Sequence, residues 1–141
     1  MDRIIVQGGQ PLNGVIRVSG AKNAVLPLIA ATLLVEGDCR IDDTPFLSDV
    51  TTMCDVLEYL GVTTHYEDHA LYTDASRLCG NEAPASYVNR MRASCLIMGP
   101  LLARLGRFRL SLPGGCKIGK RPIDLHLKGL EAMGAKISIG D

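Results

Sequence analysis

Hydrophobic and polar residues alternate along the chain in short blocks that predict a mixture of strands and helices. Alternating or β-branched runs predict strands at residues 4–7, 15–18, 39–42, 63–66, 71–73, 108–112 and 136–139. Runs with a helical period predict helices at residues 22–34, from Ser48 to a stop at Gly61, at 87–105 and at 122–133. Asn13-Gly14 is a favoured hairpin turn and joins the first two strands, whereas residues 79–86 are predicted to be a loop.

Two of the predicted helices have a clear apolar face. In the helix that opens with a Ser48 cap, that face consists of Val50, Met53, Cys54, Leu57 and Leu60. In the longer helix, it consists of residues 91, 95, 98, 101 and 102. Both helices should therefore pack one side against a common core.

Two segments of the chain resemble each other at an offset of about 70 residues. Each reads as a helix, a glycine turn, a strand, a loop and a second helix that ends in the motif L-E-x-[LM]-G-[VA], at residues 57–62 and 130–135. Such repetition implies stacked, equivalent units that share one core. We therefore predict an α/β (α+β) fold built from repeated βαβ-type units. Because the second copy breaks off one strand after its last helix, we expect the chain to be a fragment.

Composition and charge exclude several classes of function. The 141 residues include 15 basic and 15 acidic side chains, so no overall field attracts nucleic acid or a membrane surface. The five cysteines are scattered without a C-x-x-C pair, which argues against a disulfide framework and against a zinc site. The longest apolar stretch, residues 24–35, is too short to span a bilayer, and the N-terminus lacks the pattern of a signal peptide. We expect a cytoplasmic protein with reduced thiols.

Two cations lie at predicted helix starts. Lys22 opens the first helix and Arg121 directly precedes the last one. Because the N-terminal end of a helix carries partial positive charge, a cation there is mildly unfavourable. One explanation is a bound phosphate or carboxylate, which the helix end and the cation would attract together. The alternative is that both side chains simply extend into water.

Cys116 lies in the glycine-rich loop LPGGCKIGKRP, close to Lys117, Lys120 and Arg121. Nearby cations favour the thiolate and lower the thiol pKa from a free value of about 8.5. A thiol in that setting can act as a nucleophile or as a proton donor. The alternative is an incidental loop cysteine. A thiol redox protein would need a resolving cysteine, and none lies nearby in the sequence.

Other features carry weaker signals. Arg92 lies beside the apolar stripe of its helix, and this spacing alone favours a solvated arginine. The histidines share no metal-ligand spacing, so no metal site is predicted; they are His65, His69 and His126. The glycine pairs near the N-terminus fit neither a dinucleotide fingerprint nor a Walker loop, so nucleotide hydrolysis is not indicated and no cofactor is expected.

Three motifs carry a resemblance to a known family. They are SGAKNAVLP at 19–27, MRAS at 91–94 and LPGGCKIGKRPIDLHL at 112–127. Together they resemble the UDP-N-acetylglucosamine 1-carboxyvinyltransferase family of enolpyruvyl transferases. Members of that family are considerably longer and contain two inside-out barrel domains of repeated βαβ-type units around a cleft. The resemblance therefore implies that this chain corresponds to the beginning of such a protein.

The resemblance also implies a reaction and a set of site residues. Family members transfer the enolpyruvyl group of phosphoenolpyruvate to the 3-hydroxyl of UDP-N-acetylglucosamine and release phosphate, which commits the sugar nucleotide to peptidoglycan synthesis. By resemblance, Lys22 and Asn23 bind phosphoenolpyruvate. Cys116 matches the cysteine that donates the proton, forms a covalent phosphoenolpyruvate adduct and is alkylated by fosfomycin. The residues that match the sugar-nucleotide site are Arg92, Arg121, Pro122, Ile123, Asp124 and Leu125.

The resemblance divides the chain into two parts. Residues 1–20 match strands that pack into the second domain, and residues 21–141 match a partial first catalytic domain with two visible repeats. Since further site residues of the family come from the second domain, we expect this chain alone to be inactive. One alternative is a non-catalytic sugar-nucleotide-binding remnant. Another is the enolpyruvyl transferase of the shikimate pathway, which lacks the cysteine loop and has a different lysine motif.

Overall fold

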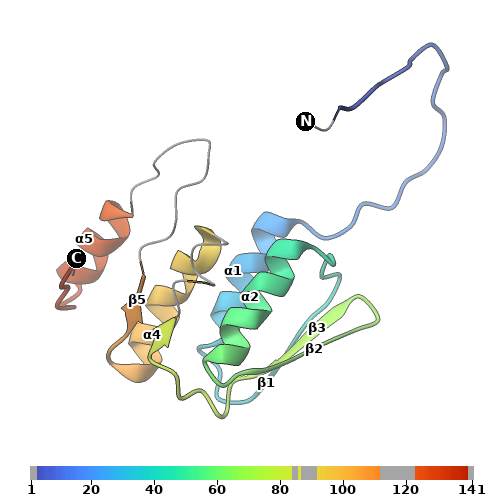
Figure 1. Ribbon diagram of the computed structural model, residues 1–141. Coiled ribbons are helices and arrows are strands. Elements are labelled where there is room, and N and C mark those ends of the chain that lie inside the picture. Colours follow the sequence, from blue (N-terminus) through green and yellow to red (C-terminus); the bar gives the residue numbers. More distant parts are fainter. Residues whose placement is uncertain (1–2, 84–85, 87–91, 112–122, 140–141) are drawn as a thin grey trace.

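The computed structural model describes residues 3–83, 86, 92–111 and 123–139 (Figure 1). The helices are α1 (Lys22–Thr32), α2 (Ser48–Tyr59), the 3-10 helix η1 (Arg92–Ile97), α4 (Met98–Leu105) and α5 (Asp124–Ala132). The strands are β1 (Asp38–Ile41), β2 (Thr63–Glu67), β3 (Ala70–Asp74), β4 (Glu82–Ala83) and β5 (Arg109–Leu110). No described helix is both long enough and apolar enough to cross a membrane.

The main sheet has the strand order β1-β3-β2, and β3 pairs antiparallel with both neighbours. β1 and β2 therefore run in the same direction on either side of β3, with α2 as the connection between them. This is a βαβ unit with a third strand inserted at its centre. β4 and β5 form a separate parallel pair. The mixed helix and strand content confirms the predicted fold class.

One face of the main sheet packs against the helices. The apolar residues of β1, β2 and β3 that point toward the core include Ile41, Tyr66 and Leu71. The fully buried side chains come from all the packed helices and from β3; the largest are Ile29, Leu33, Met53, Leu57, Leu60, Leu71, Ile97 and Leu101. The predicted apolar face of α2 is therefore confirmed, although Cys54 on that face is only partly buried.

The predicted repeat is visible where α2 and α5 end. The N–H of Gly61 donates to the carbonyl of Glu58 at 3.0 Å, and the N–H of Gly134 donates to that of Glu131 at 2.9 Å. Both glycines have positive φ angles, 95° and 100°, which residues with a Cβ rarely adopt. The motif L-E-x-[LM]-G-[VA] thus encodes the same helix ending twice.

The predicted N-terminal hairpin is wrong. Residues 3–20 contain no strand, and their apolar side chains are almost fully exposed, from 85% at Val6 to 102% at Val15. A two-stranded hairpin needs a further sheet or a helix to cover its apolar face, and no described part of the chain covers these residues. The predicted strand at 136–139 is also absent from the structure.

Three further predictions need correction. Only residues 98–105 of the predicted helix at 87–105 are α-helical, whereas residues 92–97 form the 3-10 helix and 87–91 lie outside the described residues. The physical reason is Pro100, which lacks an N–H and crowds the carbonyl one turn earlier. The predicted loop at 79–86 contains the short strand β4. Ser48 does not cap α2, whose N-cap residue is Leu47 without any side-chain cap.

Candidate functional site

The described site residues lie at the starts of three helices. Lys22 and Asn23 are the first two residues of α1, and Arg92 begins η1. Ile123 is the N-cap of α5, and the first two residues of that helix are Asp124 and Leu125. Cys116, Arg121 and Pro122 lie outside the described residues. The structure thus places most of the residues predicted to bind the sugar nucleotide within the fold, but not the thiol.

The start of α1 has an unusual electrostatic setting. Ala21 is the N-cap residue, no side chain caps the helix, and the first turn contains no acidic residue. The first N–H groups of a helix have no partner within the helix, and they carry partial positive charge. Lys22 adds a full positive charge at this end. The combination is suited to an anionic ligand.

Asp49 supplies the negative charge that α1 lacks. The Lys22 Nζ lies 2.9 Å from the Asp49 Oδ2, with side-chain exposures of 47% and 37%. Asp49 belongs to the first turn of α2, so the ion pair joins the starts of α1 and α2, which lie side by side (Figure 1). Asp49 is not among the residues predicted from the sequence, because an acidic residue in a first helical turn is ordinary.

The segment that leads into α1 requires a glycine at position 20. A Cβ atom at Gly20 would lie 2.1 Å from the carbonyl oxygen of Asp43, so only glycine fits against this backbone. Asp43 belongs to the loop between β1 and α2, which also leads to Asp49. The same loop therefore positions both partners of the Lys22–Asp49 pair.

That loop is held by the β2–β3 hairpin. The N–H of Thr44 donates to the carbonyl of His69 at 2.8 Å, and the Tyr66 hydroxyl donates to the carbonyl of Thr44 at 2.8 Å. Thr44 is 1% exposed, and its hydroxyl donates to the carbonyl of Ile41 at 2.9 Å. Residues 22 apart in the chain thus fix the loop from which α2 and Asp49 begin.

The far end of α1 is held by Arg104 of α4. Its guanidinium donates to the carbonyls of Leu33 at 2.8 Å, Val35 at 3.0 Å and Ala75 at 3.4 Å. The carbonyls at a helix C-terminus lack intrahelical partners and attract cations. α1 is therefore tied down at both ends, which keeps its first residues in place.

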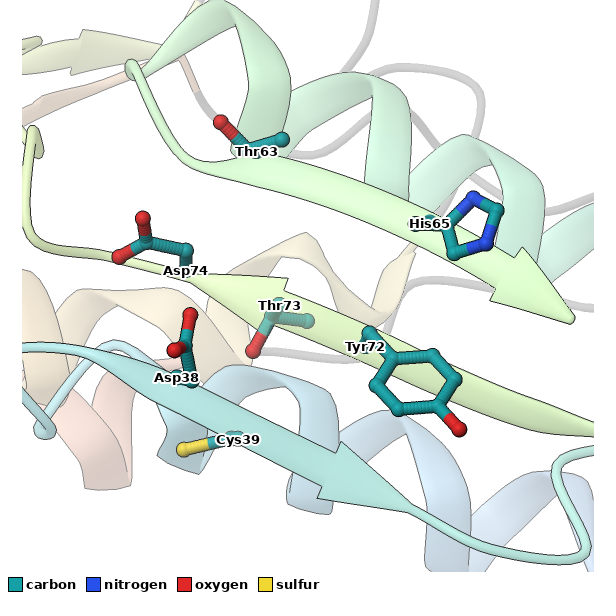
Figure 2. A pocket seen from close by; sticks show the side chains of 7 residues that line it. All are labelled: Asp38, Cys39, Thr63, His65, Tyr72, Thr73 and Asp74. Atoms are coloured by element: carbon teal, nitrogen blue, oxygen red, sulfur yellow. The ribbon is translucent and has the colours of Figure 1, made fainter.

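A shallow hollow of about 390 Å³ lies on the main sheet (Figure 2). Its lining residues are Asp38, Cys39, Thr63, His65, Tyr72, Thr73 and Asp74. None of them is a predicted site residue. The described residues contain no group of three or more His, Cys, Asp or Glu side chains that could hold a metal ion.

The described cysteines differ in their surroundings. Burial raises the pKa of the Cys54 thiol to about 11, which favours the unreactive thiol form. Cys39 and Cys95 are partly buried, and Cys79 is exposed. Cys54 and Cys95, which lie on predicted apolar helix faces, are thus both partly buried.

Comparison with known proteins identifies relatives along the whole chain. The family model of EPSP synthase (3-phosphoshikimate 1-carboxyvinyltransferase) matches residues 6–141. The chain is 54% identical over 142 residues to UDP-N-acetylglucosamine 1-carboxyvinyltransferase 1 of Halalkalibacterium halodurans, covering 100% of this chain and 32% of that protein. It is 53% identical over 139 residues to UDP-N-acetylglucosamine 1-carboxyvinyltransferase of Desulfatibacillum aliphaticivorans, covering 99% of this chain and 33% of that protein. The chain spans about a third of the length of these curated relatives.

A solved structure gives the same relationship. The crystal structure of the enolpyruvyl transferase NikO from Streptomyces tendae resembles the chain with a TM-score of 0.64 and 28% identity, covering 70% of this chain and 23% of that chain. Together, these similarities confirm the resemblance that the three sequence motifs indicate.

Proposed function

The chain belongs to the EPSP synthase family of carboxyvinyltransferases, and on that premise we propose that it contributes to transfer of the enolpyruvyl group of phosphoenolpyruvate to the 3-hydroxyl of UDP-N-acetylglucosamine. Phosphate is the second product. The observation that carries this proposal is the identity of 54% along the full chain to a relative named for the same sugar nucleotide. In the cell, the reaction would serve peptidoglycan synthesis in the cytoplasm.

Each predicted site residue has a role in this proposal. Lys22 and Asn23 bind phosphoenolpyruvate at the start of α1. The sugar nucleotide is bound by Arg92, Arg121, Pro122, Ile123, Asp124 and Leu125. Support comes from the described members of these sets, which lie at helix starts, where backbone N–H groups and the helix dipole favour phosphate. Residues 1–20 pack into a second domain, and residues 21–141 form part of the first.

Cys116 is the proposed acid of the reaction. As the sugar 3-hydroxyl gives its proton to a base and its oxygen bonds to C2 of phosphoenolpyruvate, the Cys116 thiol donates its proton to the methylene carbon C3. In the tetrahedral adduct the bond from C2 to the phosphate oxygen then breaks, phosphate leaves, and the Cys116 thiolate takes a proton back from C3 so that the vinyl group forms again. Lys and Arg side chains stabilise the charge that moves onto the phosphate oxygens during both steps.

A shikimate-pathway activity is less well supported, although the matching family model bears that enzyme's name. The two motifs that argue against it are GAKN at 20–23 and the cysteine loop around Cys116. Four relatives at 50–54% identity are named for UDP-N-acetylglucosamine. The substrate is therefore best assigned as the sugar nucleotide.

A chimera tests the proposal. Residues 1–141 of this chain replace the matching first third of the Halalkalibacterium halodurans relative, which aligns over the whole chain. Phosphate release from phosphoenolpyruvate is measured with UDP-N-acetylglucosamine or with shikimate 3-phosphate as acceptor. We expect the chimera to turn over with UDP-N-acetylglucosamine and not with shikimate 3-phosphate. We expect no turnover from the isolated chain with either acceptor. Turnover with shikimate 3-phosphate instead would refute the substrate assignment.

The same chimera tests Cys116. Fosfomycin should label this thiol, whereas Cys54, with its raised pKa, should stay unlabelled. Cys116→Asp should resist labelling while it retains some turnover, because a carboxylic acid still donates a proton. Peptide mapping that places the label on Cys54 or Cys79, with Cys116 unmodified, would exclude the proposed mechanism.

A further inference from the structure

The ion pair between Lys22 and Asp49 joins two helix starts. Lys22 is the first residue of α1, Asp49 lies in the first turn of α2, and their charged atoms are 2.9 Å apart. Of the ion pairs among the described residues, it is the one that connects two α-helices at their N-terminal ends. It therefore bridges the place where the sequence predicts anion binding.

Stability alone does not account for this pair. Both side chains are more than a third exposed, and exposed ion pairs contribute little to folding. A cation at the first position of α1 is opposed by the helix dipole, so a neutral or acidic residue would suit the fold better. Asp49 already complements the dipole of α2 without a partner. The pair makes sense if the Lys22 ammonium is needed at this position for a ligand.

We propose that Asp49 is a positioning residue that orients the Lys22 ammonium toward the phosphate-bearing substrate. This inference rests on the proposed role of Lys22 in binding phosphoenolpyruvate. An ammonium group has three N–H donors, so one donor directed at Asp49 leaves two for phosphate or carboxylate oxygens. The long lysine side chain is then ordered before the substrate arrives, which lowers the ordering cost of binding.

Asp49 is suited to this role because its own position is fixed. Its side chain is 37% exposed, and the loop that precedes α2 is held by the Thr44 and Tyr66 hydrogen bonds to the β2–β3 region. The backbone of the same loop touches Gly20, two residues before Lys22. Carboxylate and ammonium are therefore carried by segments that are packed against each other.

The test combines kinetics and spectroscopy. In the chimera, Asp49→Asn should raise the KM for phosphoenolpyruvate roughly two- to thirteenfold, the effect of one side chain that must be ordered on binding. The KM for UDP-N-acetylglucosamine should not change. Asp43→Asn is the matched control, because Asp43 lies in the loop that leads to Asp49 and pairs with Arg17 at 3.1 Å rather than with Lys22. In the isolated chain, the Lys22 ammonium NMR signal should broaden or vanish on Asp49→Asn, and it should persist on Asp43→Asn.

A double-mutant cycle separates positioning from a structural role. Asp49→Asn should have no further effect on phosphoenolpyruvate binding, measured by calorimetry, once Lys22 is replaced by Ala. Four results would each overturn the inference. In binding, they are additive effects of Asp49→Asn and Lys22→Ala, an effect of Asp43→Asn equal to that of Asp49→Asn, or tighter phosphoenolpyruvate binding by Asp49→Asn. In the NMR experiment, the result is a Lys22 signal that Asp49→Asn leaves unchanged. If Lys22→Ala itself leaves phosphoenolpyruvate binding intact, the proposed substrate site fails. If Lys22→Ala weakens binding and Asp49→Asn does not, only the positioning role fails.

Discussion

Arg104 should be the single most important charged residue for the stability of the described fold. Its side chain is 16% exposed, and its guanidinium donates to carbonyls from two other parts of the chain. Leu33 is the C-cap residue of α1, and Ala75 directly follows β3. Removing the guanidinium would leave the partly buried Leu33 carbonyl without this donor, whereas the Ala75 carbonyl would still accept from the N–H of Leu78 at 3.3 Å.

The expected loss in the free energy of unfolding follows from the hydrogen bonds of Arg104. The bond to Leu33, at 2.8 Å, has favourable length, whereas the bond to Ala75, at 3.4 Å, is long and weak. The Val35 carbonyl is exposed and can bind water instead. With about 1.5 kcal/mol or more for a well-formed bond from a charged donor, Arg104→Ala should cost about 2–4 kcal/mol. Arg104→Lys retains the charge but not the fork of donors, so it should cost about half as much.

Urea unfolding of the isolated chain, followed by circular dichroism, measures this effect. Arg107→Ala is the control, because Arg107 lies just beyond the end of α4, is exposed and should change the free energy of unfolding by no more than about 0.5 kcal/mol. If Arg104→Ala is as mild as that control, the guanidinium does not hold α1 and the reasoning is wrong. If Arg104→Lys is as damaging as Arg104→Ala, charge contributes nothing and the donor geometry accounts for the whole effect.

Three further predictions concern packing and titration. Gly20→Ala should destabilise the chain and disturb Lys22, because the added Cβ would lie 2.1 Å from a carbonyl oxygen. Gly14→Ala is the control and should be tolerated, because no atom lies within 4 Å of the added Cβ. Thermal unfolding measures both variants. Burial raises the pKa of Cys54 from 9.0 to about 11, so the fold favours the neutral thiol. The free energy of unfolding should therefore fall as pH rises between these values, and Cys54→Ala should make that fall smaller in alkaline denaturation curves. Leu60→Ala should cost about 2–5 kcal/mol because Leu60 is 0% exposed. Its repeat counterpart Met133, at 78% exposure, should tolerate alanine within about 0.5 kcal/mol in the same urea assay, and equal costs would contradict the burial assignment.

Elements with a strong local signal could be predicted from the sequence. The helix at 22–34 and the two strands at 63–66 and 71–73 agree with the structure to within about two residues, the usual disagreement at element ends. The repeated ending L-E-x-[LM]-G-[VA] also predicts the same glycine geometry twice, because a left-handed residue after a helix is a local requirement. Periodicity and glycine placement act over a few residues, and the sequence displays them directly.

The candidate site was predictable only in part. Lys22 stands out because it contradicts the helix dipole, and the motifs around it indicate a family. Arg92 differs from Lys22, because its spacing favours a solvated residue and only the MRAS motif marks it as a candidate. Asp49 had no signal of its own, because its importance depends on a partner 27 residues earlier that the packing of α1 against α2 brings to 2.9 Å.

Long-range packing determined which apolar side chains are buried and which charged groups meet. Leu60 and Met133 occupy the same place in the two motif copies, yet one is buried and the other exposed, because the end of α2 lies in the main hydrophobic core whereas α5 contributes no buried side chain. The bonds of Arg104 reach 71 and 29 residues back along the chain. Local sequence determined the positions, the ends and the apolar sides of the elements with strong periodicity, such as α1 and α2, but not of the hairpin expected near the N-terminus or of the strand expected at 136–139. Only tertiary structure determined which apolar sides are covered and which charges meet, because burial and ion pairing depend on neighbours that come from distant parts of the chain.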